Sequence, residues 1–296
     1  MNNKRFLVIL VLFSIFSLLA GCKNKSGNSR TVTVSILPQK YFIERIAGDY
    51  VDVNVMIPPG MNPATCDLNT GQLKSLYDSE LCFTIGHLPF ELTHLYPVLQ
   101  NHKNIRVIDH SEGLSLLSGS CSHTHSEGHE HGGIDPHIWL SPANARQMAT
   151  TIYETLARHY PEQKERFKGN YEVFMQDIDS VAHQAAQVFQ NPGEKVFLIY
   201  HPALTYFARD YGLEQIAIED EGKEPNPAHL KKLIDEAREK GIHLIFIQSQ
   251  FDASNAESIA REIGGKIVPI DPLAENWIAE MEKIIGVFSN TSPKAN

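Results

Sequence analysis

Short apolar runs alternate with longer amphipathic stretches along most of the chain. Near the start, residues 31–37 alternate β-branched positions and predict a strand, and residues 38–47 predict a helix that ends at Gly48. Three further apolar runs predict strands, at 51–57, 81–85 and 105–108. Strands that alternate with helical stretches indicate βαβ units and a largely parallel sheet.

The middle of the chain is predicted to be helical. Ser141 and Pro142 supply a helix N-cap and a proline at the first helical position. Pro161 ends that helix and begins another, which we expect to cover residues 161–190. At ~1.5 Å per residue such a helix spans on the order of 45 Å, enough to bridge two lobes.

The last third returns to the alternating α/β pattern. Strands are predicted at 196–200, 242–247 and 266–270, with helices beginning near His201, Asn226 and Ser254. The fold class is therefore α/β. Roughly 275 residues remain after the amino-terminal segment, and that length suits one large domain or two lobes.

The amino terminus reads as a secretory signal. Lys4 and Arg5 precede an apolar run, residues 6–20, that is short for a membrane-spanning helix. The run ends in Leu-Ala-Gly followed by Cys22, an ending that resembles the bacterial lipobox, in which the cysteine carries the lipid. We expect residues 1–22 to be the signal segment with Cys22 as the membrane anchor, and polar residues 23–30 to be a tether. An uncleaved anchor helix is the alternative.

The net charge limits the class of binding partner, and the number of cysteines limits the possible disulfides. The formal net charge of −9 argues against nucleic acid as a partner and suits a protein that attracts cations. Export permits disulfides, but the three thiols at Cys66, Cys82 and Cys121 cannot all pair within one chain. The sequence does not decide whether Cys66 and Cys82 form a disulfide.

Histidines are the most informative residues. Of 14 histidines, four lie in a Gly/Ser/His-rich tract at 119–134, a predicted surface loop, and His137 follows it. His201 and Asp271 each come directly after a predicted strand, and ligands of open parallel sheets bind outside the carboxyl ends of strands. Imidazole and carboxylate groups can converge there on one ion. A structural role for His201, and a solvated tract without a role for the loop, are the simpler alternatives.

Four ordered blocks carry a family resemblance. They are residues 135–140 (Asp-Pro-His-Ile-Trp-Leu), 200–213 (beginning Tyr-His-Pro-Ala), 224–227 (Glu-Pro-Asn-Pro) and 270–273 (Ile-Asp-Pro-Leu). In this order they resemble the zinc/manganese solute-binding lipoproteins of ABC transporters, known as cluster A-I. The resemblance extends from about residue 31 to 288, and the lipobox and His-rich loop are typical of the same family.

The resemblance implies a clamp of two α/β lobes, each with a mainly parallel sheet flanked by helices. Lobes at 31–160 and 191–296 are joined by one long rigid helix at 161–190. By analogy His137, His201 and Asp271 bind the ion. The resemblance further implies an extracytoplasmic monomer that delivers zinc to an ABC permease. Zinc is favoured by the His-rich loop, and manganese is the alternative.

One position departs from the family pattern. The family has a histidine after the proline of a Gly-x-x-Pro-His segment, where this chain has Ala64. Alanine cannot bind a metal ion, so the first lobe lacks one expected ligand. The candidate replacements for this ligand are a loop histidine such as His129 or His131, the side chain of Cys66 or Asp67, or a water molecule. Alternatively, the site binds its ion with lower affinity or binds a different ion.

Two other function classes remain as alternatives. The first alternative is a metal-dependent hydrolase, because a catalytic zinc ion also has three protein ligands and one open coordination position. The chain has no His-Glu-x-x-His or Gly-x-Ser-x-Gly motif, and the acidic run 219–221 reads most simply as a solvated loop. The other is a receptor for an organic ligand such as a metal chelate, for which the sequence contains no aromatic cluster.

Overall fold

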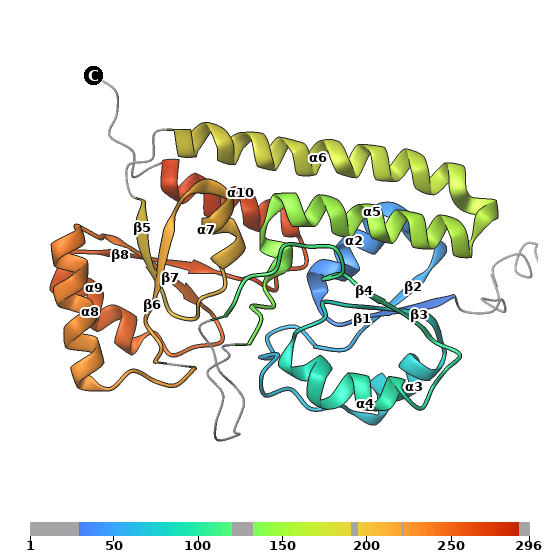
Figure 1. Ribbon diagram of the computed structural model, residues 1–296, viewed down its shortest axis with the longest axis horizontal. Coiled ribbons are helices and arrows are strands. Elements are labelled where there is room, and N and C mark those ends of the chain that lie inside the picture. The colour runs from blue at the N-terminus through green and yellow to red at the C-terminus, as the bar shows by residue number, and fades with distance from the viewer. Residues whose placement is uncertain (1–29, 120–132, 191–194, 221, 290–296) are drawn as a thin grey trace, which may run out of the picture.

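The computed structural model describes residues 30–119, 133–190, 195–220 and 222–289. Over these ranges the chain forms two α/β lobes side by side, and one long helix, α6 (Lys164–Gln190), runs along both (Figure 1). The predicted fold class, two parallel-sheet lobes joined by a long helix, is therefore confirmed. None of the helices in these ranges has the length and apolarity needed to cross a membrane.

The first lobe contains a four-stranded parallel sheet in the order β2-β1-β3-β4. Its strands are β1 (Thr31–Val34), β2 (Asp52–Val55), β3 (Ser79–Thr84) and β4 (Arg106–Asp109). Its helices are α2 (Leu37–Ala47), α3 (Thr70–Tyr77), α4 (Tyr96–Leu99) and α5 (Pro142–His159), with short helical segments η1 (Gly48–Tyr50), η2 (Glu91–Leu95), η3 (Ile138–Leu140) and η4 (Pro161–Gln163). As predicted, Ser141 caps α5, accepting a hydrogen bond from the Asn144 amide.

The second lobe repeats this strand order. Its parallel sheet runs β6-β5-β7-β8. The strands are β5 (Val196–Ile199), β6 (Glu214–Ala217), β7 (Leu244–Gln248) and β8 (Lys266–Ile270), and the helices are α7 (Thr205–Tyr211), α8 (Pro227–Lys240), α9 (Ser254–Ile263) and α10 (Trp277–Ser289). In both sheets the strand order reverses next to the first strand, and such reversal points are where open α/β sheets bind ligands.

Helix α6 packs on both lobes through its apolar face. Phe174 near its middle contacts Phe42 of α2 edge to face at 5.0 Å between ring centroids. Phe189 near its end contacts Phe288 of α10, also at 5.0 Å. Because one continuous helix packs against both hydrophobic cores, bending between the lobes would disrupt the aromatic packing at one end of the helix or the other.

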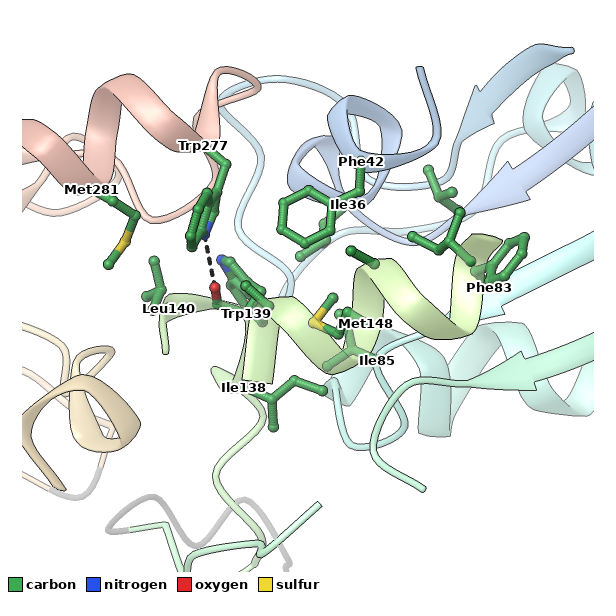
Figure 2. Close-up of a cluster of buried hydrophobic side chains, with 14 of the residues drawn as sticks. Ile36, Phe42, Phe83, Ile85, Ile138, Trp139, Leu140, Met148, Trp277 and Met281 are labelled. Carbon is green, nitrogen blue, oxygen red and sulfur yellow. Dashed lines mark hydrogen bonds between the residues drawn. The ribbon is translucent and has the colours of Figure 1, made fainter. Parts of the chain in front are cut away.

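A pair of tryptophans ties the lobes together beside this helix. The Trp139 indole of η3 donates to the Pro272 carbonyl at 2.7 Å. The Trp277 indole of α10 donates to the Trp139 carbonyl at 2.7 Å, the bond drawn in Figure 2. Both side chains are at most 2% exposed. Each buried N–H therefore has its acceptor across the lobe junction, which joins the two hydrophobic cores directly.

Strand β6 and helices α3, α4 and α10 were absent from the sequence-based prediction. Strand β6 carries polar residues at Glu214 and Gln215, and α10 follows a loop without a clear capping signal. The predicted strand at 31–37 is also too long, because α2 already begins at Leu37. The predicted helix at 161–190 divides into η4 and α6.

Candidate metal centre

A cavity of about 400 Å³ lies between the lobes. Segments that follow every strand except β1 line it, so the carboxyl ends of both sheets contribute. Its wall includes Ala64, His87, His137, His201 and Glu219. Two of the three predicted ligands therefore lie in one cavity, one from each lobe.

His137 is fixed by the residue two positions before it. The Asp135 carboxylate accepts hydrogen bonds from the His137 amide and from its ring nitrogen Nδ1, both at 2.8 Å. The Asp135 carbonyl in turn accepts from the hydroxyl of Tyr206 in the second lobe at 2.8 Å. Burial pushes the pKa of Asp135 upward, but the neighbouring His137 ring and amide hold that pKa below its ordinary value.

His201 is fixed by residues from two other strand ends. Both carboxylate oxygens of Glu219, which lies just beyond β6, are 3.0 Å from Nδ1 of His201. Gln248, the last residue of β7, accepts from the His201 amide at 3.2 Å and donates to the His201 carbonyl at 2.6 Å. The Phe251 ring stacks on the imidazole at 5.6 Å between centroids.

Each histidine thus has a carboxylate on Nδ1. A carboxylate only accepts hydrogen bonds, so Nδ1 carries a proton, and in the neutral ring Nε2 keeps the lone pair that can bind a metal ion. The two rings lie 5.2 Å apart between centroids. Metal-binding histidines generally donate their second ring nitrogen to such a carboxylate, which fixes the tautomer and the ring orientation. The arrangement suits a divalent ion that accepts imidazole nitrogen.

The structure gives Glu219 a role that the sequence-based interpretation missed. The acidic run at 219–221 was interpreted as a solvated loop, yet Glu219 is only 6% exposed. The available signal was its position, just past a strand that ends at the same sheet edge as His201. Because that strand, β6, had not been predicted, the sequence analysis did not place Glu219 beside His201.

Asp271 follows β8 directly, as predicted, but it is not among the residues that line the cavity. Its Oδ1 accepts from the Leu273 amide at 3.0 Å, and its own amide donates to Glu280 at 2.8 Å. The neighbouring Pro272 and Leu273 do line the cavity. The role of Asp271 as a ligand stays a prediction.

The remaining predicted residues are distributed as follows. Cys66 and Cys82 are both buried free thiols, so the disulfide left open above is not formed. Burial raises the pKa of the Cys66 thiol, and Cys66 does not line the cavity, which makes it a poor substitute for the missing ligand. Cys22, Cys121, His129 and His131 lie outside the described residues. Within those residues, no three His, Cys, Asp or Glu side chains are yet close enough to share an ion.

Sequence comparison identifies the family of the chain. The family profile described as "ZnuA: Zinc-uptake complex component A periplasmic" matches residues 32–290. The chain belongs to the ZnuA family. This membership confirms the predicted relationship to zinc/manganese solute-binding proteins, a class of transport proteins.

Two curated relatives are named for zinc. The high-affinity zinc uptake system protein ZnuA of Bacillus subtilis is 27% identical, with 96% of this chain and 93% of that protein covered. The zinc-binding lipoprotein AdcA of Streptococcus pneumoniae is 26% identical over 96% of this chain, which spans only 61% of AdcA.

Solved structures of the family have the same fold. A ZnuA crystal structure superposes with a TM-score of 0.80 at 35% identity, covering 88% of this chain and 98% of the other. The Zn(II)-bound AdcA of Streptococcus pneumoniae gives 0.74 at 25% identity, covering 90% and 58%. The manganese complex of FpvC from Pseudomonas aeruginosa, at 0.75 and 21% identity over 89% and 98%, shares the fold.

Proposed function

We propose that this protein captures zinc outside the cytoplasm and delivers it to the permease of an ABC importer. The observation that carries the proposal is the pair of imidazoles from opposite lobes, 5.2 Å apart and each held by a carboxylate. Zinc accepts imidazole nitrogen readily and is most often four-coordinate. Manganese, a harder ion that prefers oxygen ligands, is the alternative cargo.

The ligand set in this proposal is His137, His201 and Asp271. Asp271 would join the histidines after its side chain rotates away from the Leu273 amide. The proposal is of capture and not of catalysis. Hydrolysis of a generic ester or phosphoester that disappears in His201→Ala would instead support a hydrolase.

The anchoring and partner follow from the amino-terminal pattern and the relatives' names. Residues 1–22 would be the signal segment, Cys22 would carry the lipid, and residues 23–30 would tether a monomeric binding protein near its permease. The name of AdcA as a zinc-binding lipoprotein supports this arrangement. Lobes at 31–160 and 191–296, with a linking helix between them, complete the proposed organisation.

The test is competitive metal loading. The metal-free chain lacking residues 1–22 is offered equal zinc and manganese, and bound metal per chain is measured after desalting. We expect one retained zinc, lost in His137→Ala and in His201→Ala. His183→Ala removes an imidazole from the exposed face of α6, where it contacts Gln187, and serves as the matched control. Retention of zinc in both site variants would refute the proposed site.

A further inference from the structure

The third imidazole of the site is absent from the position where the family pattern places it, but another histidine lines the same cavity. Ala64 belongs to the segment after β2, and His87 belongs to the loop that follows β3. Both are in the first lobe and both line the space that contains His137 and His201. No feature of the sequence analysis had singled out His87.

The backbone around His87 is held firmly by one buried carboxylate. Glu91 is fully buried and accepts from the Ile85 amide at 2.7 Å, the Gly86 amide at 2.7 Å and the Leu88 amide at 3.4 Å. The hydroxyl of Ser35 donates to the same carboxylate. Amides on both sides of His87 therefore have fixed partners, while His87 itself remains half-buried at the cavity wall.

The turn before His87 is equally constrained. Gly86 has φ of 104°, in the left-handed region that favours glycine. A Cβ there would collide with the side chains of Asp109 and Ser111. These contacts fix the backbone on both sides of His87 and so fix where its side chain leaves the loop. Binding sites need supporting contacts of this kind around each ligand residue.

The ring of His87 is available for binding. In the ranges that the structure describes, the imidazole forms no hydrogen bond, ion pair or ring contact. Its neighbours on the wall, Leu88, Pro89 and Leu92, are apolar and offer no partner. The cavity of about 400 Å³ leaves room for the side chain to rotate toward the histidine pair.

We propose that His87 supplies the third imidazole of the zinc site, in place of the histidine that Ala64 replaces. This inference rests on the proposed function and specifies how the first lobe completes the site. His87 and His137 would then bind from the first lobe and His201 from the second. The three side chains are not within common reach of one ion among the described residues, so the proposal requires the His87 side chain to rotate toward the other two.

The experiment combines zinc affinity with a count of ligands. The mature protein, His87→Ala and the control His94→Ala are titrated with zinc against a chromophoric chelator, and X-ray absorption counts the imidazoles on bound zinc. His94 lies on η2 near His87, is half-exposed beside Asp67, and does not line the cavity. We expect three imidazoles in the unmodified protein and in His94→Ala, and two in His87→Ala with at least about tenfold weaker binding.

A transfer variant separates a ligand from a residue that shapes the wall. Ala64→His combined with His87→Ala should regain three imidazoles and most of the affinity, because position 64 lines the same cavity. A folded double variant that stays weak with two imidazoles would overturn the assignment, and so would an unchanged count in His87→Ala. Loss of stoichiometric zinc in the unmodified protein, or its retention in His201→Ala, would instead refute the proposed function.

Discussion

Glu219 provides the sharpest test of how the site is held. The proposed role of this carboxylate is to orient His201, because both its oxygens lie 3.0 Å from Nδ1 of that ring. The Glu219 side chain is 4% exposed and that of His201 is 24% exposed, so solvent screens their interaction only weakly. Glu219→Ala leaves Phe251 stacking as the principal constraint on the ring.

The expected loss of zinc affinity can be taken from other carboxylates that orient a metal-binding histidine. Removal of a carboxylate that orients a metal-binding histidine typically costs 10–100-fold in metal affinity, which is about 1.4–2.7 kcal/mol. Glu219→Gln keeps one acceptor oxygen and should lose less than Glu219→Ala. Zinc affinity, measured at neutral pH by chelator competition, gives the ranking.

Asp220→Asn is the matched control. It removes a neighbouring negative charge, and the Asp220 side chain accepts from Asn226 instead of His201. If Asp220→Asn weakens zinc binding as much as Glu219→Gln, the effect is a general one of charge. If Glu219→Ala binds zinc like the unmodified protein, orientation of His201 by Glu219 is refuted. A loss as complete as in His201→Ala would mean that Glu219 binds the ion itself.

Two predictions concern stability. Burial lowers the pKa of His110 to about 3, so in the range between that value and about 6.5 the unfolded chain binds a proton that the folded chain does not. Above about pH 6.5 this histidine is neutral in both states and its titration leaves stability unchanged, whereas below that value the free energy of unfolding decreases by on the order of 1.4 kcal/mol per pH unit through the range. Urea unfolding of His110→Gln between pH 7 and pH 4.5 should show a slope reduced by about one proton, and an unchanged slope would contradict the assignment. Trp277→Phe removes the donor to the buried Trp139 carbonyl and should lower the free energy of unfolding by about 1–3 kcal/mol in urea titrations, whereas a loss below ~0.5 kcal/mol would mean that this bond does not stabilise the lobe junction.

Local pattern was enough to determine the α/β class and most elements. Ser141 with Pro142, and Asn226 with Pro227, mark helix starts through contacts within three residues, and the structure has both caps. The apolar strand β7 is equally clear in the sequence, because all five of its residues are buried in the centre of the sheet. The resemblance carried by residues 135–140 and 200–213 then led to the two-lobe architecture.

Tertiary structure alone decided how the site is assembled. The four residues of β6 become a strand through pairing with β5, a long-range contact that no local pattern encodes. That pairing carries Glu219 to His201, 18 positions away. The placement of His87 in the same cavity as Ala64 likewise depends on two separate strand ends meeting at one sheet edge. The sequence determined which residues can bind a metal ion, and long-range strand pairing decided which of them lie together.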